Sequence, residues 1–152
     1  MASRQIERIC NRFQIVARQL QHRHEDRPTI DITDEYDVQD LFHSLLRLYF
    51  DDIRDEEWSP SYAAGASRVD FLLKQEQIVI EIKKTRTSLK ARQLGEQLII
   101  DIARYQSHPD CKLLYCFVYD PDHFIANPQG IENDLSRSQN GLNVRVLIVP
   151  KA

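Results

Sequence analysis

The chain is poor in the residues that mark disordered, disulfide-stabilised or membrane-spanning proteins. Its 152 residues include only 4 glycines, 6 prolines and 3 cysteines. Little Gly and Pro argues against low-complexity segments, and an odd number of scattered cysteines argues for reduced thiols. No apolar run is long enough to cross a bilayer, and the start is rich in arginine, unlike a signal core. We therefore expect a globular cytoplasmic protein with no membrane segment.

The chain also lacks an excess of positive charge. It carries 20 Lys and Arg against 23 Asp and Glu, a net charge of -3. Overall electrostatics therefore gives no support for nucleic-acid binding. Cations do gather locally, at Lys83, Lys84, Arg86, Lys90 and Arg92. A patch of this kind can bind phosphate on an acidic protein when bound metal ions supply part of the missing positive charge.

What is present is a helical apolar pattern that gives way to strands near residue 55. Helical spacing covers residues 3–24, 34–50 and 88–106, with a short helix at 130–136. Strand patterns cover 57–63 (weak, interrupted by Pro60), 67–74, 78–84, 112–119 and 144–149. The last two strands are continuously apolar, as in strands covered on both faces. An antiparallel hairpin followed by a helical crossover predicts an α/β fold with a mixed central sheet flanked by helices.

Residues 1–26 form a predicted N-terminal amphipathic extension to a domain spanning 27–152. The apolar residues recur at alternating steps of three and four: Ile6, Ile9, Phe13, Val16 and Leu20. Such a stripe usually packs on its own domain. It could instead pair with a second copy of the chain or with a helix of a partner protein, because its spacing also suits a coiled coil.

The strongest chemical signal lies on the hairpin formed by residues 67–74 and 78–84. Alternation along the second strand places Glu81 and Lys83 on one face, about 7 Å apart. A turn near Gln75 would bring Asp70 opposite Glu81. The sequence therefore predicts two carboxylates and a lysine gathered at one point.

Two converging carboxylates repel each other unless a cation joins them. Mg²⁺ (or Mn²⁺) suits such a site, because it binds one or two carboxylates together with carbonyl and phosphate oxygens and water. We expect Asp70, Glu81 and the carbonyl of Ile82 to be the ligands. The ion would polarise a phosphoryl group and activate a water. Lys83 could hold or deprotonate that water, or neutralise charge in the transition state.

An Ile-Glu-Ile-Lys strand is also what any half-exposed strand looks like. Two helices favour the functional interpretation. The helix at 88–106 carries Gln97 and Asp101 one turn apart within an apolar stretch, and the helix at 34–50 carries Glu35 and Gln39 toward its inner side. Buried polar groups need partners, so their convergence with the hairpin predicts a site.

Residues 35 to 150 resemble a nuclease domain of the PD-(D/E)XK superfamily, with the closest likeness to small restriction-endonuclease-like domains of bacterial defence systems. The pieces that match are EYDVQDLFHSLLRLYF (35–50), SRVDFLL (67–73), IVIEIKK (78–84) and QLIIDIARY (97–105). Val69 stands where the superfamily's name has proline.

The resemblance implies that Asp70 and Glu81 bind Mg²⁺ and that Lys83 assists hydrolysis. It also implies that the first helix donates Glu35 or Gln39, and that the later helix donates Gln97, with Asp101 or Tyr105 as a further polar group. Asp101 stands where related exonuclease-like members often have tyrosine.

The predicted function is metal-dependent hydrolysis of phosphodiester bonds, in DNA, by a prokaryotic defence effector. Four cations near the motif are expected to contact phosphates, although a solvated surface is the simpler interpretation of such a run: Arg68, Lys84, Arg86 and Lys90. The alternative function is a catalytically inactive nuclease-like module for nucleic-acid binding or assembly.

Overall fold

The computed structural model of the chain describes residues 1–55, 58–59, 67–68 and 70–151, with 58–59 and 67–68 described by backbone alone. Its helices are α1 (Ala2–Gln21), α2 (Glu35–Leu46), α3 (Ala91–Tyr105) and α4 (Pro128–Leu135), with a 3₁₀ turn at His24–Asp26. The longer strands are β4 (Phe71–Leu73), β5 (Ile78–Lys84), β6 (Leu113–Tyr119) and β8 (Leu142–Val149). Four two-residue strands complete the order: β1 (Arg54–Asp55), β2 (Trp58–Ser59), β3 (Ser67–Arg68) and β7 (Ser138–Gln139).

Six strands form one mixed sheet in the order β1-β4-β5-β6-β8-β7. The three long central strands β5, β6 and β8 are parallel, and β1, β4 and β7 join antiparallel at the two sides. The strands β2 and β3 pair separately. The parallel crossover from β5 to β6 runs through α3, as βαβ connections usually do. The predicted α/β fold with a mixed sheet is confirmed.

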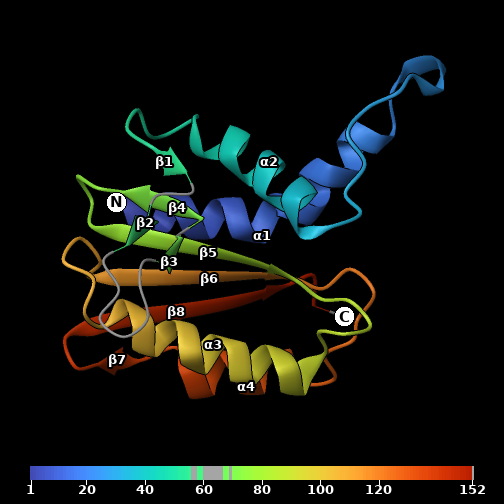
Figure 1. Cartoon of the computed structure of the whole chain (residues 1–152). Coiled ribbons are helices and arrows are strands. Elements are labelled where there is room, and N and C mark those ends of the chain that lie inside the picture. Colours follow the sequence, from blue (N-terminus) through green and yellow to red (C-terminus); the bar gives the residue numbers. More distant parts are fainter. Residues whose placement is uncertain (56–57, 60–66, 69, 152) are drawn as a thin grey trace.

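Helices cover the sheet on both faces (Figure 1). On one face α1 and α2 pack over an apolar cluster that includes Phe13, Phe42 and Phe117. On the other face α3 and α4 pack over a second cluster that includes Leu98 and Val144. Alternation divides each strand between the two clusters, so both faces of β5, β6 and β8 are buried.

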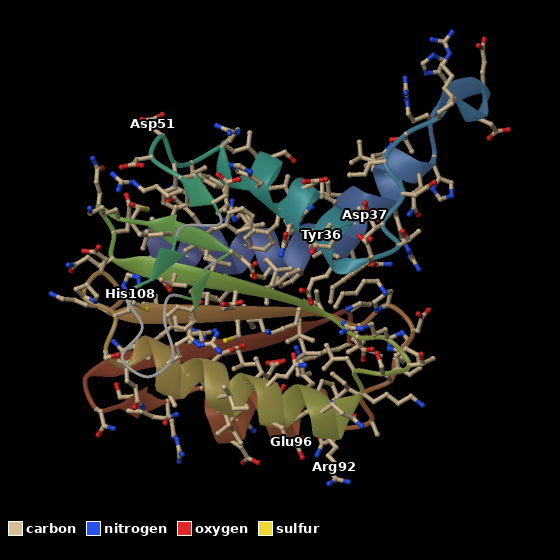
Figure 2. The ribbon with its side chains drawn as sticks, viewed as in Figure 1. Tyr36, Asp37, Asp51, Arg92, Glu96 and His108 are labelled. Carbon is tan, nitrogen blue, oxygen red and sulfur yellow. The ribbon has the colours of Figure 1, made fainter. Side chains whose placement is uncertain are left out.

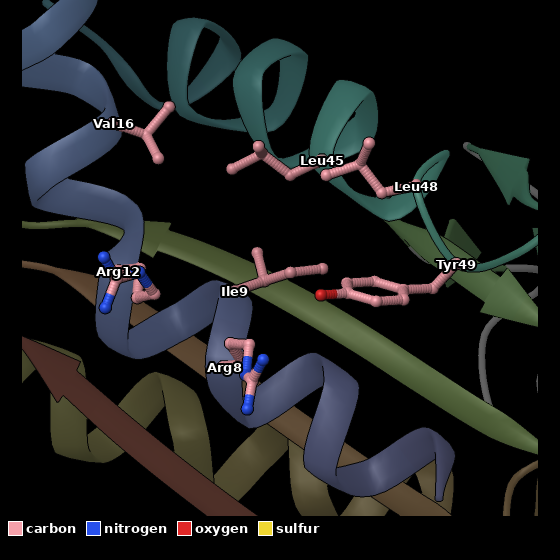
Figure 3. A pocket seen from close by; sticks show the side chains of 7 residues that line it. All are labelled: Arg8, Ile9, Arg12, Val16, Leu45, Leu48 and Tyr49. Carbon is pink, nitrogen blue, oxygen red and sulfur yellow. The ribbon is translucent and has the colours of Figure 1, made fainter.

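Helix α1 packs on its own chain, with Ile6, Ile9 and Phe13 buried in the first cluster. Its apolar stripe is therefore used within the molecule, and a contact with another chain through α1 would have to use the outer side of the helix. Beside the stripe, a groove separates α1 from the end of α2 (Figure 3). The groove is lined by Arg8, Ile9, Arg12, Val16, Leu45, Leu48 and Tyr49.

The hairpin differs from the prediction in one respect. The expected strand at 67–74 is divided: Ser67 and Arg68 pair with β2, and only Phe71–Leu73 pair with β5. Asp70 lies at a bend between the two pieces. Of the expected strand at 57–63, the structure describes only Trp58–Ser59, and Val69 lies outside the described residues.

Among the described residues, the short β4 leaves part of β5 without a neighbouring strand on one edge. Phe71 pairs with Ile80 at the start of β4, whereas β5 continues to Lys84. On its other edge β5 stays paired with β6 up to Lys84. Backbone N–H groups of residues 82 and 84 therefore need other acceptors on the β4 side. Within the described residues no helix is long and apolar enough to span a membrane.

Candidate active site

Asp70 stands opposite Glu81, as the register of the hairpin predicts. Phe71 pairs with Ile80, so the next step outward brings Asp70 to the level of Glu81. Both carboxylate oxygens of Asp70 are held. Oδ1 accepts a hydrogen bond from the side chain of Gln39 (Nε2, 2.8 Å), and Oδ2 accepts one from the backbone N–H of Ile82 (2.7 Å). The carboxylate is thereby fixed at the point where β4 ends.

Glu81 is buried on the face of β5 that α3 covers. Its neighbours on that face are Val79 and Lys83, while Ile80 and Ile82 point into the other cluster. Oε1 of Glu81 accepts a hydrogen bond of 2.5 Å from the hydroxyl of Tyr105 at the end of α3. The second candidate carboxylate is therefore held from α3, and the first from α2 and the backbone of β5.

Lys83 forms an ion pair with Asp101 of α3. Its Nζ lies 2.9 Å from Oδ2 of Asp101, and both side chains are largely buried. That oxygen makes no directed hydrogen bond with the described part of the chain, so the contact is electrostatic in character. Asp101 also forms an ion pair with Arg104, whose Nη1 lies 3.5 Å from Oδ1 of Asp101. The ammonium of Lys83 is thus oriented toward α3, two residues beyond Glu81 on the same strand.

Glu35 and Asp70 satisfy the open edge of β5. Glu35 Oε1 accepts the backbone N–H of Lys84 (3.2 Å), just as Asp70 accepts that of Ile82. The N–H and C=O of one strand residue point to the same edge, so the carbonyl of Ile82 also faces this side. Two carboxylates and a carbonyl therefore gather where β4 no longer covers β5.

The two facing carboxylates of Asp70 and Glu81 are electrostatically unfavourable as a pair. Burial raises the pKa of Asp70. Burial, followed by the charge of Asp70, raises the pKa of Glu81 well above its ordinary value. Desolvation and like charge both disfavour the ionised form. A cation between the two groups would remove this cost.

The neighbouring groups respond differently. Burial lowers the pKa of Lys83, but the charges of Asp101 and Glu81 outweigh burial and raise it overall. Burial raises the pKa of Glu35. Burial also raises the pKa of Tyr105, followed by the charge of Glu81, so its hydroxyl remains a donor at neutral pH.

Several predicted residues lie away from this cluster. Gln97 is exposed on α3 and makes no side-chain hydrogen bond with the described part of the chain. Lys84 is buried, with Nζ on the carbonyl of Thr85 (3.2 Å), so a phosphate contact would require its side chain to move. Arg86 and Lys90 are exposed, near the end of β5 and at the start of α3. The side chain of Arg68 lies outside the described residues.

Local spacing in the sequence did not predict two contacts of α3: that of Tyr105 with Glu81 and that of Arg104 with Asp101. A signal for the first was present, because Tyr105 follows Asp101 by one helical turn and therefore shares its face. The opposite face of α3 carries Arg92 and Glu96, which pair in solvent and point away from the sheet (Figure 2). Helix α3 therefore carries Asp101 and Tyr105 toward the sheet and Arg92 and Glu96 toward solvent.

The sheet and helices form a restriction-endonuclease-like fold, with polar groups gathered at the end of β5. A family model of DpnII-MboI restriction endonucleases (REase_DpnII-MboI) matches residues 4–151. The chain belongs to this family. The match begins inside α1, so it includes a helix that the sequence motifs alone left out. Comparisons with curated proteins and with solved structures gave no match.

The residues present fit a divalent cation of the Mg²⁺ type. No cluster of three or more His, Cys, Asp or Glu side chains in the described residues is arranged to hold a metal ion. Mg²⁺ does not need one, because it usually takes one or two carboxylates and completes its shell with water and substrate oxygens. The Asp70–Glu81 pair, with the Ile82 carbonyl on the same side, meets that lower requirement.

Proposed function

We propose that the chain is a Mg²⁺- or Mn²⁺-dependent endonuclease of the PD-(D/E)XK type that hydrolyses phosphodiester bonds in DNA, as a prokaryotic defence effector. Membership of a restriction endonuclease family supports DNA as the substrate. The observation that carries the metal centre is the pair formed by the half-buried Asp70 and the buried Glu81, each held by a hydrogen bond from a different helix, with Lys83 two residues beyond Glu81.

In this proposal Asp70, Glu81 and the carbonyl of Ile82 hold the ion. When bound, it would polarise the scissile phosphate and activate a water. Gln39 orients Asp70 through the hydrogen bond of its amide. Once it leaves Asp101, the ammonium of Lys83 would stabilise the negative charge that develops on the phosphate.

The remaining predicted residues have secondary roles in the proposal. Glu35 supports the open edge of β5 through the N–H of Lys84, and Asp101 holds Lys83 in the absence of substrate. Gln97, being exposed, is free to reach DNA. Among the predicted phosphate contacts the exposed Arg86 and Lys90 suit that role directly, whereas Lys84 would have to leave its buried position. Arg68 stays a prediction from the sequence.

The experiment compares the wild type with Glu81→Gln and with Glu76→Gln. The second variant is a matched control, because Glu76 is an exposed glutamate in the turn of the same hairpin. Supercoiled plasmid, single-stranded DNA and RNA are each incubated with Mg²⁺, with Mn²⁺ and with EDTA. Glutamine at position 81 can still accept the hydrogen bond of Tyr105, so the change removes charge while the hydrogen bond persists.

We expect the wild type and Glu76→Gln to cleave DNA with either metal and to be silent in EDTA, and Glu81→Gln to be slower by about 100-fold or more. Cleavage that persists in EDTA would contradict the metal centre. DNA binding without cleavage by the wild type would favour the alternative of an inactive nucleic-acid-binding module. Cleavage of RNA in preference to DNA would overturn the substrate.

A further inference from the structure

Tyr105 is a buried residue whose hydroxyl donates to a carboxylate of the candidate site. Its side chain is fully buried in the cluster beneath α3, and its ring lies 6.2 Å from the ring of His108. The hydroxyl donates to Oε1 of Glu81 at 2.5 Å. A buried phenol needs a partner for its O–H, and here the partner is one of the two carboxylates assigned to the metal.

The position of Tyr105 is well defined. It lies in the last turn of α3, a 15-residue helix whose Leu94, Leu98 and Ile102 are buried against the sheet. A hydroxyl carried by a packed helix can fix a carboxylate more firmly than one carried by a loop. The side chain of Glu81 also lies in hydrogen-bonding contact with the side chain of Asp70, and the described residues supply no second helical donor to it. One oxygen is therefore held by the helix and the other is not.

We propose that Tyr105 is a positioning residue that acts through Glu81: by holding Oε1 it directs Oε2 toward Asp70 and preforms the metal site. This inference rests on the proposed function. It assigns to Tyr105 no contact with DNA, and it makes Glu81 a ligand through one oxygen.

Asp70 is held in the same manner by a helix on the opposite face of the sheet. Gln39 of α2 donates to its Oδ1, while Tyr105 of α3 donates to Glu81. Helices on the two faces thus each fix one carboxylate at the point where the strand edge opens. Residues that hydrogen-bond a metal ligand commonly contribute about 10- to 100-fold to metal affinity. The same order is expected for Tyr105.

The test is Mn²⁺ affinity, measured by titration calorimetry on the full chain without DNA, for the wild type, Tyr105→Phe and Tyr115→Phe. Tyr115 is the matched control, because it is equally buried but lies in the other cluster, where its hydroxyl contacts Ser3. Each variant loses one oxygen atom and keeps its ring. The melting temperature of each variant without metal accompanies the titration, and cleavage of plasmid is followed against Mn²⁺ concentration.

Tyr105→Phe should bind Mn²⁺ about 10- to 100-fold more weakly, and Tyr115→Phe should bind as the wild type does. Cleavage by Tyr105→Phe should recover as Mn²⁺ is raised, with KM for DNA unchanged. Wild-type affinity in Tyr105→Phe, or an equal loss in both variants, would overturn the inference and leave the proposed function intact. A wild type that binds no Mn²⁺ would overturn both.

Discussion

The two faces of the central sheet bury different kinds of side chain. Under α1 and α2 the cluster is dominated by rings, among which Phe13, Phe42 and Phe117 touch one another. Under α3 the same sheet buries carboxylates and a lysine beside its apolar residues. The ring face carries charge near the end of β5, at Glu35 and Lys84, whereas the face under α3 carries Glu81, Lys83 and Asp101 together, at a cost in desolvation. Within the described residues, the ring face contributes to the candidate site only through Glu35 and Gln39 of α2, so the charges of the site and the packed rings lie largely on different faces of the sheet.

The largest expected effect is a loss of DNA cleavage when a charge of the candidate site is removed. Asp70→Asn removes a charge from the candidate site and should lower DNA cleavage by about 1000-fold or more, because the metal ion would lose an anionic ligand and would no longer be held where it can stabilise the developing charge on the phosphate. The melting temperature without metal should change little. In Asp70→Asn the side-chain oxygen at position 70 can still accept the N–H of Ile82. The side-chain amide of Gln39 can rotate so that its oxygen accepts a hydrogen bond from the new NH2 group.

Plasmid cleavage with Mg²⁺ and thermal unfolding without metal check this prediction. The partly exposed Asp52, which pairs with Arg54, offers a control in Asp52→Asn. A large fall in melting temperature for Asp70→Asn would mean that the carboxylate stabilises the fold, which would contradict its assignment to the candidate site alone.

The second prediction concerns the ring cluster. Phe42 is fully buried and its ring centroid lies 5.1 Å from that of Phe117. Phe42→Ala should lower the free energy of unfolding by about 3–5 kcal/mol, because a large cavity opens in a packed core. Urea denaturation followed by circular dichroism measures the loss. A cost below about 1 kcal/mol would show that this face is loosely packed.

How far the sequence predicts the molecule differs between the faces as well. Alternation in residues 78–84 indicates which side chains share a face, and the apolar stripe of α1 indicates its packing. The pairing of Asp70 with Glu81 follows from the turn. These features depend on local spacing, which the sequence carries directly.

Other features depend on how separate elements meet. The division of the strand at 67–74, the burial of Lys84 and the exposure of Gln97 do not follow from local spacing. The contact of Lys83 with Asp101 depends on the rotation of α3 about its axis. A run of cations looks the same in sequence whether its members are solvated or buried.

A further prediction uses the buried thiols of both faces as reporters. Cys10 lies in the ring cluster, and Cys111 and Cys116 lie under α3. Burial raises the pKa of Cys111 to about 12 and raises those of Cys10 and Cys116 as well. In the unfolded chain a cysteine thiol has a pKa of about 8.5. The contribution of the buried thiols to the free energy of unfolding is therefore complete below about pH 8.5, and it is lost as the pH rises toward the pKa of the thiols in the folded protein.

Two measurements check the thiols: the free energy of unfolding from about pH 8 to about pH 11, and the rate of reaction with a thiol reagent near about pH 8. Stability should decline on the alkaline side, and all three thiols should react only on unfolding. Rapid labelling of Cys116 but not of Cys10 in Cys→Ala variants would show that the α3 face opens on its own. Rapid labelling of Cys10 would contradict the close packing of the ring cluster.

The most direct test of the proposed site is plasmid cleavage in Mg²⁺ by Lys83→Ala beside Lys74→Ala, an exposed lysine of the same hairpin. If Asp70, Glu81 and Lys83 form a catalytic centre, Lys83→Ala should cleave more slowly by about 100-fold or more, while Lys74→Ala and the wild type should cleave alike. Wild-type cleavage by Lys83→Ala would contradict the account.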